Sequence, residues 1–332
     1  MPDILVIGSL NADLVVRAQR FPLPGETISG EDLQIFPGGK GANQAVAAAR
    51  LGASVSMLGR VGKDNFGNYL LENLESNKVD SQLVQSDDAS TGTAIIVVDS
   101  NGQNSIVLSA GANGRVSPAD VRTASFPDPS TPLRHSLWSQ RDGSGQRFSL
   151  LLLQLEIPIE TVLSATRRAK ESGLRVLLNP APARSLPEEL ISLPDFLLPN
   201  EIELSLLTNQ TVNDIPSAEK ASKILLGRGA QTIILTLGAN GALIVTREVT
   251  RHIPPFKVNV VDTTAAGDAF IGGFAVRLLE CGRRSLTPNA LELEEAVRYG
   301  CACGALATTR FGAQPSLPTR EEVERFMSLR AA

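Results

Sequence analysis

The stretch Val260-Val261-Asp262-Thr263-Thr264-Ala265-Ala266-Gly267-Asp268-Ala269-Phe270 lies where an extended pattern changes into a helical one. Two carboxylates, Asp262 and Asp268, stand six residues apart across small residues. A helix that begins between Ala265 and Gly267 would direct unbonded backbone N–H groups and its positive dipole end at one point. Such a helix end is a binding site for an anion.

Asp268 would then lie beside the bound anion. Phosphate repels a carboxylate, so an acid here makes sense if it accepts a proton from an attacking hydroxyl. We expect the helix end to keep Asp268 ionised, and phosphoryl transfer needs only a weak base in the right place. We therefore interpret this stretch as a kinase site with Asp268 as base and Ala265, Ala266 and Gly267 as the anion hole. The alternative is an N-capping Asp followed by small residues for close helix packing.

The length and composition set the general class. A chain of 332 residues can bury a large core, and 42% hydrophobic with 20% charged residues is typical of a globular protein. The net charge of −4 gives no reason to expect nucleic acid or an anionic membrane as a partner. Three cysteines do not make a disulfide framework, and no apolar stretch is long enough to span a bilayer. Because Met1-Pro2-Asp3 runs directly into an apolar strand, we expect no targeting peptide and a cytoplasmic location, with a nuclear fraction left open.

Apolar strands and helices alternate along the rest of the chain. This pattern predicts an α/β fold, with one domain over residues 1–332 built on a doubly wound, mostly parallel sheet flanked by helices. The expected strands are residues 4–7, 55–59, 150–155, 176–179, 196–198 and 232–237. Polar or glycine-rich residues follow these strands, and ligands bind at the carboxyl ends of strands in such sheets.

Two segments interrupt this alternation. Residues 14–36 and 93–109 have short alternating patterns broken by Pro and Gly, so we expect antiparallel strands that form a small β-sheet lid outside the main sheet. Exposed strands of this kind predict pairing with a second subunit, and hence a homodimer. Residues 123–149 have the composition of an irregular loop.

A glycine-rich turn precedes the first strong helix. Gly38-Gly39-Lys40-Gly41-Ala42-Asn43-Gln44 leads into the helical residues 45–51. The glycines allow close approach of the backbone to a ligand, while Lys40 and Asn43 offer donors to hydroxyl groups. The turn lacks the spacing of a Walker A loop, and an ordinary tight turn is the alternative.

In this order, the pieces resemble the ribokinase and PfkB family of carbohydrate kinases from residue 4 to 318, except at 123–149. Gly38 to Asn43 matches the first family signature, and Asp262 to Asp268 the second. The resemblance implies a ribokinase-like fold and ATP-dependent phosphorylation of D-ribose at the 5-hydroxyl. The alternatives are another sugar or nucleoside kinase of the family, or an inactive sugar-binding relative, which the presence of Asp268 and Gly267 disfavours.

The resemblance also implies roles for single residues. The sugar would contact Asn11, Ala12, Asp13, Gly39, Lys40, Gly41, Ala42, Asn43, Glu156 and Asp268. ATP would contact Asn200, Thr236, Leu237, Gly238, Ala239, Asn240, Gly241, Gly267, Asp268 and Cys301, with Mg²⁺ linked to Glu203 of an Asn-x-x-Glu motif. K⁺ would be bound around Asp262, Thr264, Ala307, Arg310, Gly312 and Ser316.

Two of these positions carry further expectations. Many family members have Gly where this chain has Ala265, and we expect a helix-compatible Ala to leave its N–H group free. Asp262 would hold the cation that orders the anion hole. The alternative is that Asp262 only hydrogen-bonds to the loop before the helix.

Overall fold

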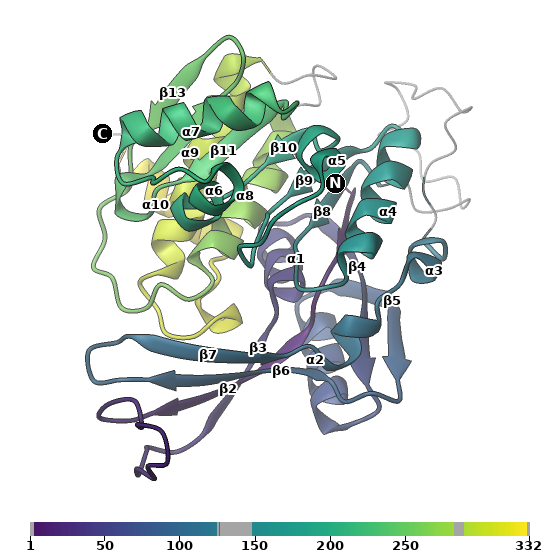
Figure 1. The fold of residues 1–332 in the computed structure, drawn as a ribbon, viewed down its shortest axis with the longest axis vertical. Helices are drawn as coiled ribbons and strands as arrows, with labels where there is room; N and C mark the ends of the chain where they lie inside the picture. Colours follow the sequence, from purple (N-terminus) through teal and green to yellow (C-terminus); the bar gives the residue numbers. More distant parts are fainter. Residues whose placement is uncertain (1–2, 125, 127–147, 282–288, 331–332) are drawn as a thin grey trace.

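A central sheet with helices on both faces forms the body of the protein (Figure 1). The structure, a computed structural model, describes residues 3–124, 126, 148–281 and 289–330. The described sheet has nine strands in the order β13-β12-β11-β10-β9-β8-β1-β4-β5. They are β1 Asp3–Ile7, β4 Ser54–Gly62, β5 Val79–Asp87, β8 Leu150–Leu153, β9 Arg175–Leu178, β10 Phe196–Leu197, β11 Thr232–Thr236, β12 Ala242–Val245 and β13 Thr250–Ile253.

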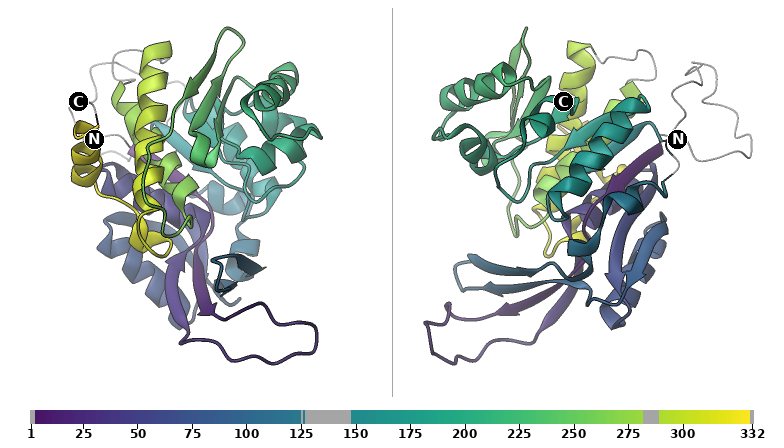
Figure 2. Two further views of the ribbon diagram at one scale, coloured as in Figure 1. Left: turned by 90° about the vertical axis from the view of Figure 1, so that its left-hand side faces the viewer. Right: turned by 45° about the vertical axis from the view of Figure 1, so that its right-hand side comes forward.

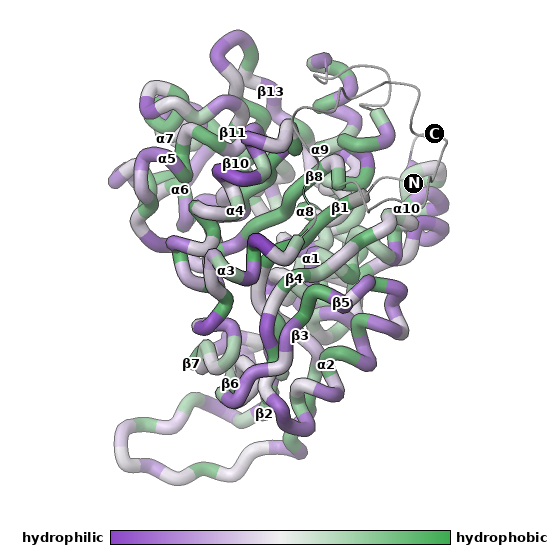
Figure 3. The backbone as a smooth tube through the Cα atoms, turned by 90° about the vertical axis from the view of Figure 1, so that its right-hand side faces the viewer, coloured by the Kyte–Doolittle hydropathy of each residue, from purple (hydrophilic) through white to green (hydrophobic). Residues whose placement is uncertain are grey.

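The apolar strands separate two hydrophobic layers. Side chains alternate along a strand, so Ile4 and Val6 of β1 enter one apolar cluster while Leu5 and Ile7 enter the other. Figure 3 shows β1, β4 and β8 as hydrophobic segments inside the molecule. A strand covered on both faces has this continuous apolar sequence, which is why its position could be predicted.

Helices cover each layer (Figure 2). The first is covered by α1 Lys40–Arg50, α2 Asn65–Ser76, α8 Ala266–Cys281, α9 Ala290–Ala307 and α10 Arg320–Ser328. The second is covered by α3 Pro118–Val121, α4 Ile159–Glu171, α5 Glu188–Ser192, α6 Glu201–Thr208 and α7 Ile215–Gly227. Short 3₁₀ turns are η1 Gly111–Arg115, η3 Gly238–Asn240 and η4 Gln314–Ser316.

The order of the strands gives the place where a ligand would bind. The chain runs from β1 outward to β4 and β5, and then returns to place β8 on the other side of β1. All pairs from β5 to β11 are parallel, whereas β12 and β13 add an antiparallel edge. This confirms the predicted doubly wound, mostly parallel sheet, and its topological switch point lies between β1 and β8.

A second sheet projects from the body, at the bottom of Figure 1. It contains β3 Gln34–Gly38, β2 Asn11–Arg17, β6 Gly92–Val98 and β7 Asn104–Ser109, in that order. The predicted hairpin of residues 93–109 is confirmed. The expectation of purely antiparallel strands is wrong, because β2 pairs with β6 in parallel. Between β2 and β3 the chain forms a long loop with a single bridge, from Ala18 to Gly30, rather than further strands.

Three other expectations concern the chain as a whole. The irregular loop predicted at 123–149 lies almost entirely outside the described residues. Cys281, Cys301 and Cys303 are all free thiols. In the described part of the chain, no helix combines the length and the apolar character needed to cross a membrane.

Candidate active site

The polar residues after β1 and β8 meet at the start of α1. Ser9 Oγ donates a hydrogen bond to Glu156 Oε2 at 2.5 Å, and the Lys40 backbone N–H donates to the same oxygen at 3.0 Å. The Gly41 N–H donates to Ser9 Oγ at 3.3 Å. The Glu156 carboxylate therefore lies at the positive end of α1, where the helix dipole favours a negative charge.

The glycines before α1 allow close packing against the end of β1. Gly39 has a φ of +86°, and a Cβ atom there would lie 2.7 Å from the Asn11 backbone N. A Cβ atom on Gly41 would lie 2.6 Å from the Ser9 N. These glycines therefore make room for the protein's own backbone after β1. The close approach of this turn to a ligand stays a prediction. This packing holds Lys40 and Asn43 at the switch point.

Asn11 is held by a residue that the sequence did not point to. Asn113, which is almost fully buried, donates from Nδ2 to Asn11 Oδ1 at 2.7 Å and to the Leu10 carbonyl at 3.0 Å. Its Oδ1 accepts from the Leu10 N–H at 2.9 Å. These bonds fix the amide orientation of Asn11. The only sequence signal was a polar residue in the Gly111-Ala112-Asn113 turn after a strand.

Asp268 reaches the same place from α8. A Cβ atom on Gly272, one turn later, would lie 2.5 Å from Ala47 Cβ, so the absence of a side chain lets α8 pack closely against α1. Asn43 Nδ2 donates to Asp268 Oδ2 at 2.9 Å, and Gln44 Nε2 donates to Oδ1 at 3.0 Å. The structure therefore combines features of both interpretations. Asp268 lies at the proposed site, and a small residue of α8 allows the close helix packing that the alternative expected.

Burial changes the electrostatics that we expected at Asp268. Burial raises the pKa of this carboxyl, and the charge of Glu156 adds to that, whereas Lys40 and the amides of Asn43 and Gln44 lower it. Burial therefore opposes the ionised form of Asp268 that we expected the helix end to favour. Its charged form relies on Lys40 and on the two amide donors.

Lys40 faces four carboxylates. Burial lowers its pKa, but the charges of Asp268, Glu156, Glu203 and Asp13 outweigh burial and raise it, so the ammonium stays charged. Burial raises the pKa of Asp13 to about 7, with Glu156 and Asp268 adding to the rise and Lys40 opposing it. The structure therefore brings Lys40 close to the base, a point that the sequence did not establish.

The expected anion hole has an unusual backbone. Ala265 has a φ of +58°, so the expectation of a helix-compatible Ala is wrong. This left-handed conformation is one that glycine adopts most readily. The Ala266 N–H donates to the Thr263 carbonyl at 3.2 Å, whereas no described residue accepts from the N–H groups of Ala265 or Gly267. A Cβ atom on Gly267 would meet no atom within 4 Å, which leaves room for an anion beside these N–H groups.

Asp262 is hydrogen-bonded to the surrounding loops. Its Oδ1 accepts from the N–H and Oγ1 of Thr264, at 2.9 and 2.7 Å, and its Oδ2 accepts from the Gly312 N–H at 2.9 Å. These are the hydrogen bonds expected if Asp262 only bonds to the loop before the helix, which was the alternative to a cation site. They do not exclude a cation, because Oδ2 retains a lone pair and the nearby backbone carbonyls are also hard oxygen donors. The Arg310 guanidinium, which pairs with Glu322, is a cation without an acceptor atom, so only the Arg310 carbonyl could bind a cation at this place.

The predicted nucleotide residues lie after β10 and β11. Asn200 and Thr236 pair as a parallel bridge, which brings their two strand ends together. Asn200 and Glu203 form a capping box at the start of α6: the Asn200 N–H donates to Glu203 Oε2 at 2.8 Å, and the Glu203 N–H donates to Asn200 Oδ1 at 2.8 Å. Burial raises the pKa of Glu203, with the Asn200 N–H and Lys40 opposing. Cys301 is buried on α9, and burial raises the pKa of its thiol to about 12.

The turn from Thr236 to Gly241 completes this side. It contains Leu237, Ala239 and Asn240, and Gly238 has a φ of +51°. A Cβ atom on Gly241 would lie 2.2 Å from the Ile253 carbonyl, so only glycine fits there. A Cβ atom on Gly238 would meet nothing within 4 Å, so this part of the turn is open.

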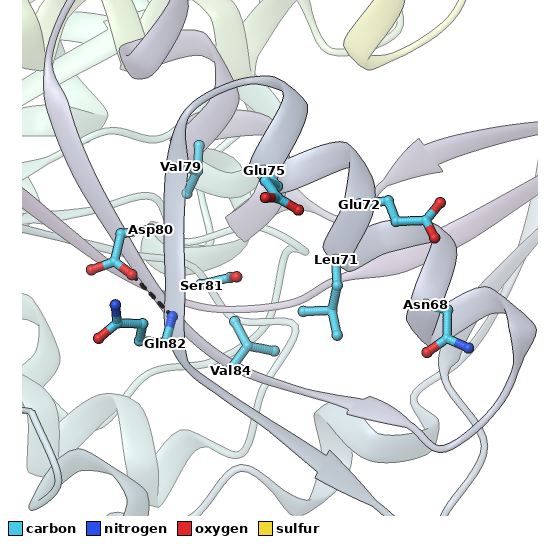
Figure 4. A pocket seen from close by; sticks show the side chains of 9 residues that line it. All are labelled: Asn68, Leu71, Glu72, Glu75, Val79, Asp80, Ser81, Gln82 and Val84. Carbon is cyan, nitrogen blue, oxygen red and sulfur yellow. Dashed lines mark hydrogen bonds between the residues drawn. The ribbon is translucent and has the colours of Figure 1, made fainter.

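A surface hollow of about 570 Å³ lies elsewhere, between α2 and β5 (Figure 4). Its lining includes Glu72, Glu75 and Asp80. None of the predicted sugar or nucleotide residues lines it, and it lies against the edge strand β5, which β4 separates from β1. We therefore do not assign the reaction to this hollow.

Sequence comparison decides the family. The sequence profile described as pfkB family carbohydrate kinase matches residues 1–320. The chain belongs to this family. It is 40% identical to a ribokinase of Haemophilus influenzae, over 98% of each chain, and 38% identical to a deoxyribokinase of Salmonella typhi, over 98% of this chain and 99% of that protein. The fold is similar to that of a ribokinase from Arabidopsis thaliana complexed with ribose and ATP, with a TM-score of 0.82, 30% identity and 98% coverage of each chain.

Proposed function

We propose that this protein transfers the γ-phosphoryl group of ATP to the 5-hydroxyl of D-ribose, giving ribose 5-phosphate. One observation carries the proposal: the base lies beside two kinds of binding group, one suited to a phosphate and one suited to a sugar hydroxyl. Asp268 stands at the start of α8 beside the N–H groups of Ala265 and Gly267, which no described residue engages. Next to it, the buried Oδ1 of Asn43 has no described hydrogen-bond partner and is suited to a sugar hydroxyl.

Each group has a task in this reaction. Asn11, Asp13, Asn43 and Glu156 would bind the sugar hydroxyls, since amide and carboxylate oxygens match a polyhydroxy substrate. Asp268 accepts the proton of the 5-hydroxyl while the hydroxyl oxygen forms a bond to the γ-phosphorus. At the same time, the bond between the γ-phosphorus and the bridging oxygen breaks, and ADP leaves with that oxygen.

The charge that develops on the transferred group would be met by Lys40 and by the N–H groups of Ala265 and Gly267. Lys40 and Gly267 lie at the starts of the packed helices α1 and α8, and Ala265 lies in the turn just before α8. The turn at residues 236–241 and the buried Cys301 would contact the nucleotide.

Two cations fit this chemistry. Mg²⁺ bound with the nucleotide would neutralise phosphate charge, and Glu203 is the residue that we link to it. K⁺ would be held by Asp262 and by carbonyl or hydroxyl oxygens of Thr264, Ala307, Arg310, Gly312 and Ser316. Because Asp262 already bonds to Thr264, a cation there would order the turn that carries the anion hole.

The small sheet supports a homodimer through the lid. In the strand register, Leu14 lies opposite Ile35 and Ile95, and Ile95 lies opposite Val107, so these four apolar side chains share one face. Val107 is 64% exposed and Ile95 is 52% exposed. Asp13 is on the opposite face because side chains alternate along β2. One face would therefore cover the sugar while the other pairs with a second copy, and we place this homodimer in the cytoplasm.

An ADP-release assay tests the proposal. With Mg²⁺ and K⁺ present, kcat/KM is measured for ribose, 2-deoxyribose, fructose and adenosine, and we expect ribose to give the highest value. The deoxyribokinase relative makes 2-deoxyribose the sharpest competitor. A higher kcat/KM for any of the other three substrates would overturn the assignment to ribose, and no ADP release with all four would overturn the kinase reaction.

A further inference from the structure

Gln44 is a fully buried amide whose hydrogen-bonding atoms all meet polar partners. It lies on α1 and is 0% exposed. Its Nε2 donates to Asp268 Oδ1 at 3.0 Å and to Asn179 Oδ1 at 3.3 Å. Its Oε1 accepts from Gln154 Nε2 at 2.6 Å. The amide therefore has one favourable orientation, because a flip would turn its oxygen toward two acceptors.

The partners of Gln44 are themselves fixed. Gln154, which follows β8, is 0% exposed, and its Oε1 packs so tightly on Gly8 that a Cβ atom there would lie 2.1 Å away. Asn179, which follows β9, donates from Nδ2 to the Leu198 carbonyl at 2.9 Å, so its Oδ1 is the atom left for Gln44. These amides form a buried network at the carboxyl ends of two neighbouring strands.

The burial of this network calls for an explanation. Buried polar groups give little net stability even when they are hydrogen-bonded, and apolar groups of the same shape are often no worse. Asn43 Nδ2 also donates to Asp268, at Oδ2, but Asn43 borders the proposed sugar site and is needed there. Gln44 has no access to the sugar, so its bond to Oδ1 persists when substrate binds.

We propose that Gln44, oriented by Gln154, is a positioning residue that holds Asp268 by Oδ1 and so makes Oδ2 the oxygen that takes the proton from the substrate hydroxyl. Without it, the bond from Asn43 to Oδ2 alone would hold the carboxylate, which could then rotate about its Cβ–Cγ bond and present Oδ2 at an unfavourable angle. This inference rests on the proposed kinase reaction and assigns the two oxygens of its base separate roles.

Other groups also act on Asp268, and the test has to separate them from Gln44. Lys40 on α1 favours the charged form, whereas Glu156 after β8, Asp13 on β2 and Glu203 on α6 oppose it. A variant that leaves these four charges in place and removes only an amide isolates the contribution of the network. Methionine replaces glutamine with nearly the same shape and no donor.

The experiment compares wild type with Gln44→Met and Gln154→Met, using the pH dependence of kcat and the KM for sugar. We expect Gln44→Met to lower kcat by about 10-fold or more, and to move the acid limb of the profile to higher pH by roughly half a unit or more, because the ionised base loses a donor. The KM for sugar should change by less than about 3-fold, since Gln44 does not touch it. Gln154→Met should act in the same direction with a smaller effect.

Thr166→Val is the matched control. Thr166 is also fully buried, on α4, and its hydroxyl donates to the Val162 carbonyl at 2.8 Å. It should leave the acid limb where it is in wild type, because the hydroxyl that it removes bonds within α4. An unmoved acid limb in Gln44→Met would overturn the inference, and if that variant does not fold, an unmoved limb in Gln154→Met decides in the same way. If wild type phosphorylates a different sugar, the proposed substrate is wrong, and the same comparison on that sugar still tests Gln44.

Discussion

Replacing Asp13 by Asn should make the protein more stable at neutral and alkaline pH while it weakens sugar binding. Asp13 lies on β2, is 8% exposed and is packed against Gly38, where a Cβ atom would lie 2.1 Å from Asp13 Oδ2. Asn has the same shape as Asp, so it fits this space. It carries no charge into the cluster of carboxylates.

The magnitude follows from the pKa of Asp13, which burial raises from 3.8 to about 7. One pKa unit corresponds to about 1.36 kcal/mol, so the ionised carboxylate makes the fold less stable at pH 8 by about 4 kcal/mol at most. The folded state binds the proton more tightly than the unfolded chain. Stability contributed by the protonated form is therefore fully present below about pH 4 and is lost as the pH rises through about 7.

Urea unfolding at several pH values, without sugar, measures this effect. The free-energy gap between Asp13→Asn and wild type should widen by about 2–3 kcal/mol between pH 5 and pH 7 and then stay constant. Asp32→Asn is the control, because Asp32 is an exposed residue of the loop before β3 and should give a curve parallel to wild type. Parallel curves for Asp13→Asn and wild type would refute the reasoning.

Three other predictions concern the chemistry, the cation and the assembly. Asp268→Asn should lower kcat by about 100-fold or more, with ribose and ATP affinities by calorimetry within about 3-fold of wild type, and near-normal turnover would remove it from the chemistry. At equal ionic strength, wild type should turn over faster in K⁺ than in tetramethylammonium and Asp262→Ala should lose this difference, so equal wild-type rates in the two salts would contradict the cation site. Val107→Lys should convert a dimer into a monomer in light scattering, because the charge lies on the exposed lid face, and a monomeric wild type at micromolar concentration would contradict the dimer.

The fold could be predicted because its signals are local. A strand buried on both faces is a continuous apolar run, as at residues 4–7, and each run ends in polar or glycine-rich residues. Seven parallel strands of this kind permit few arrangements. The parallel pairing of β2 with β6 could not be predicted in the same way. The direction of β6 depends on the long connection from β2, which contains β3, α1, β4, α2 and β5.

The parts of the site that sequence reasoning missed depend on distant contacts. Gln44 bonds to a residue 224 positions away, and Asn113 bonds to one 103 positions away. Neither amide has a local pattern that distinguishes it from an ordinary polar residue. The left-handed backbone at Ala265 was also hidden, because Ala is the strongest helix former and its sequence context favours a helix.

The charges around Lys40 give a physical reason why cations would help the proposed reaction. Lys40 faces Asp13, Glu156, Glu203 and Asp268, and with all four carboxylates ionised the cluster would carry a net charge of −3. An ATP molecule brings further negative charge to the same place, and in a buried site the repulsion is strong because the effective dielectric is low. The N–H groups of Ala265 and Gly267 supply only partial positive charges. The proposed phosphoryl transfer would therefore be helped by cations that enter with the nucleotide, by protonation of Asp13, or by both.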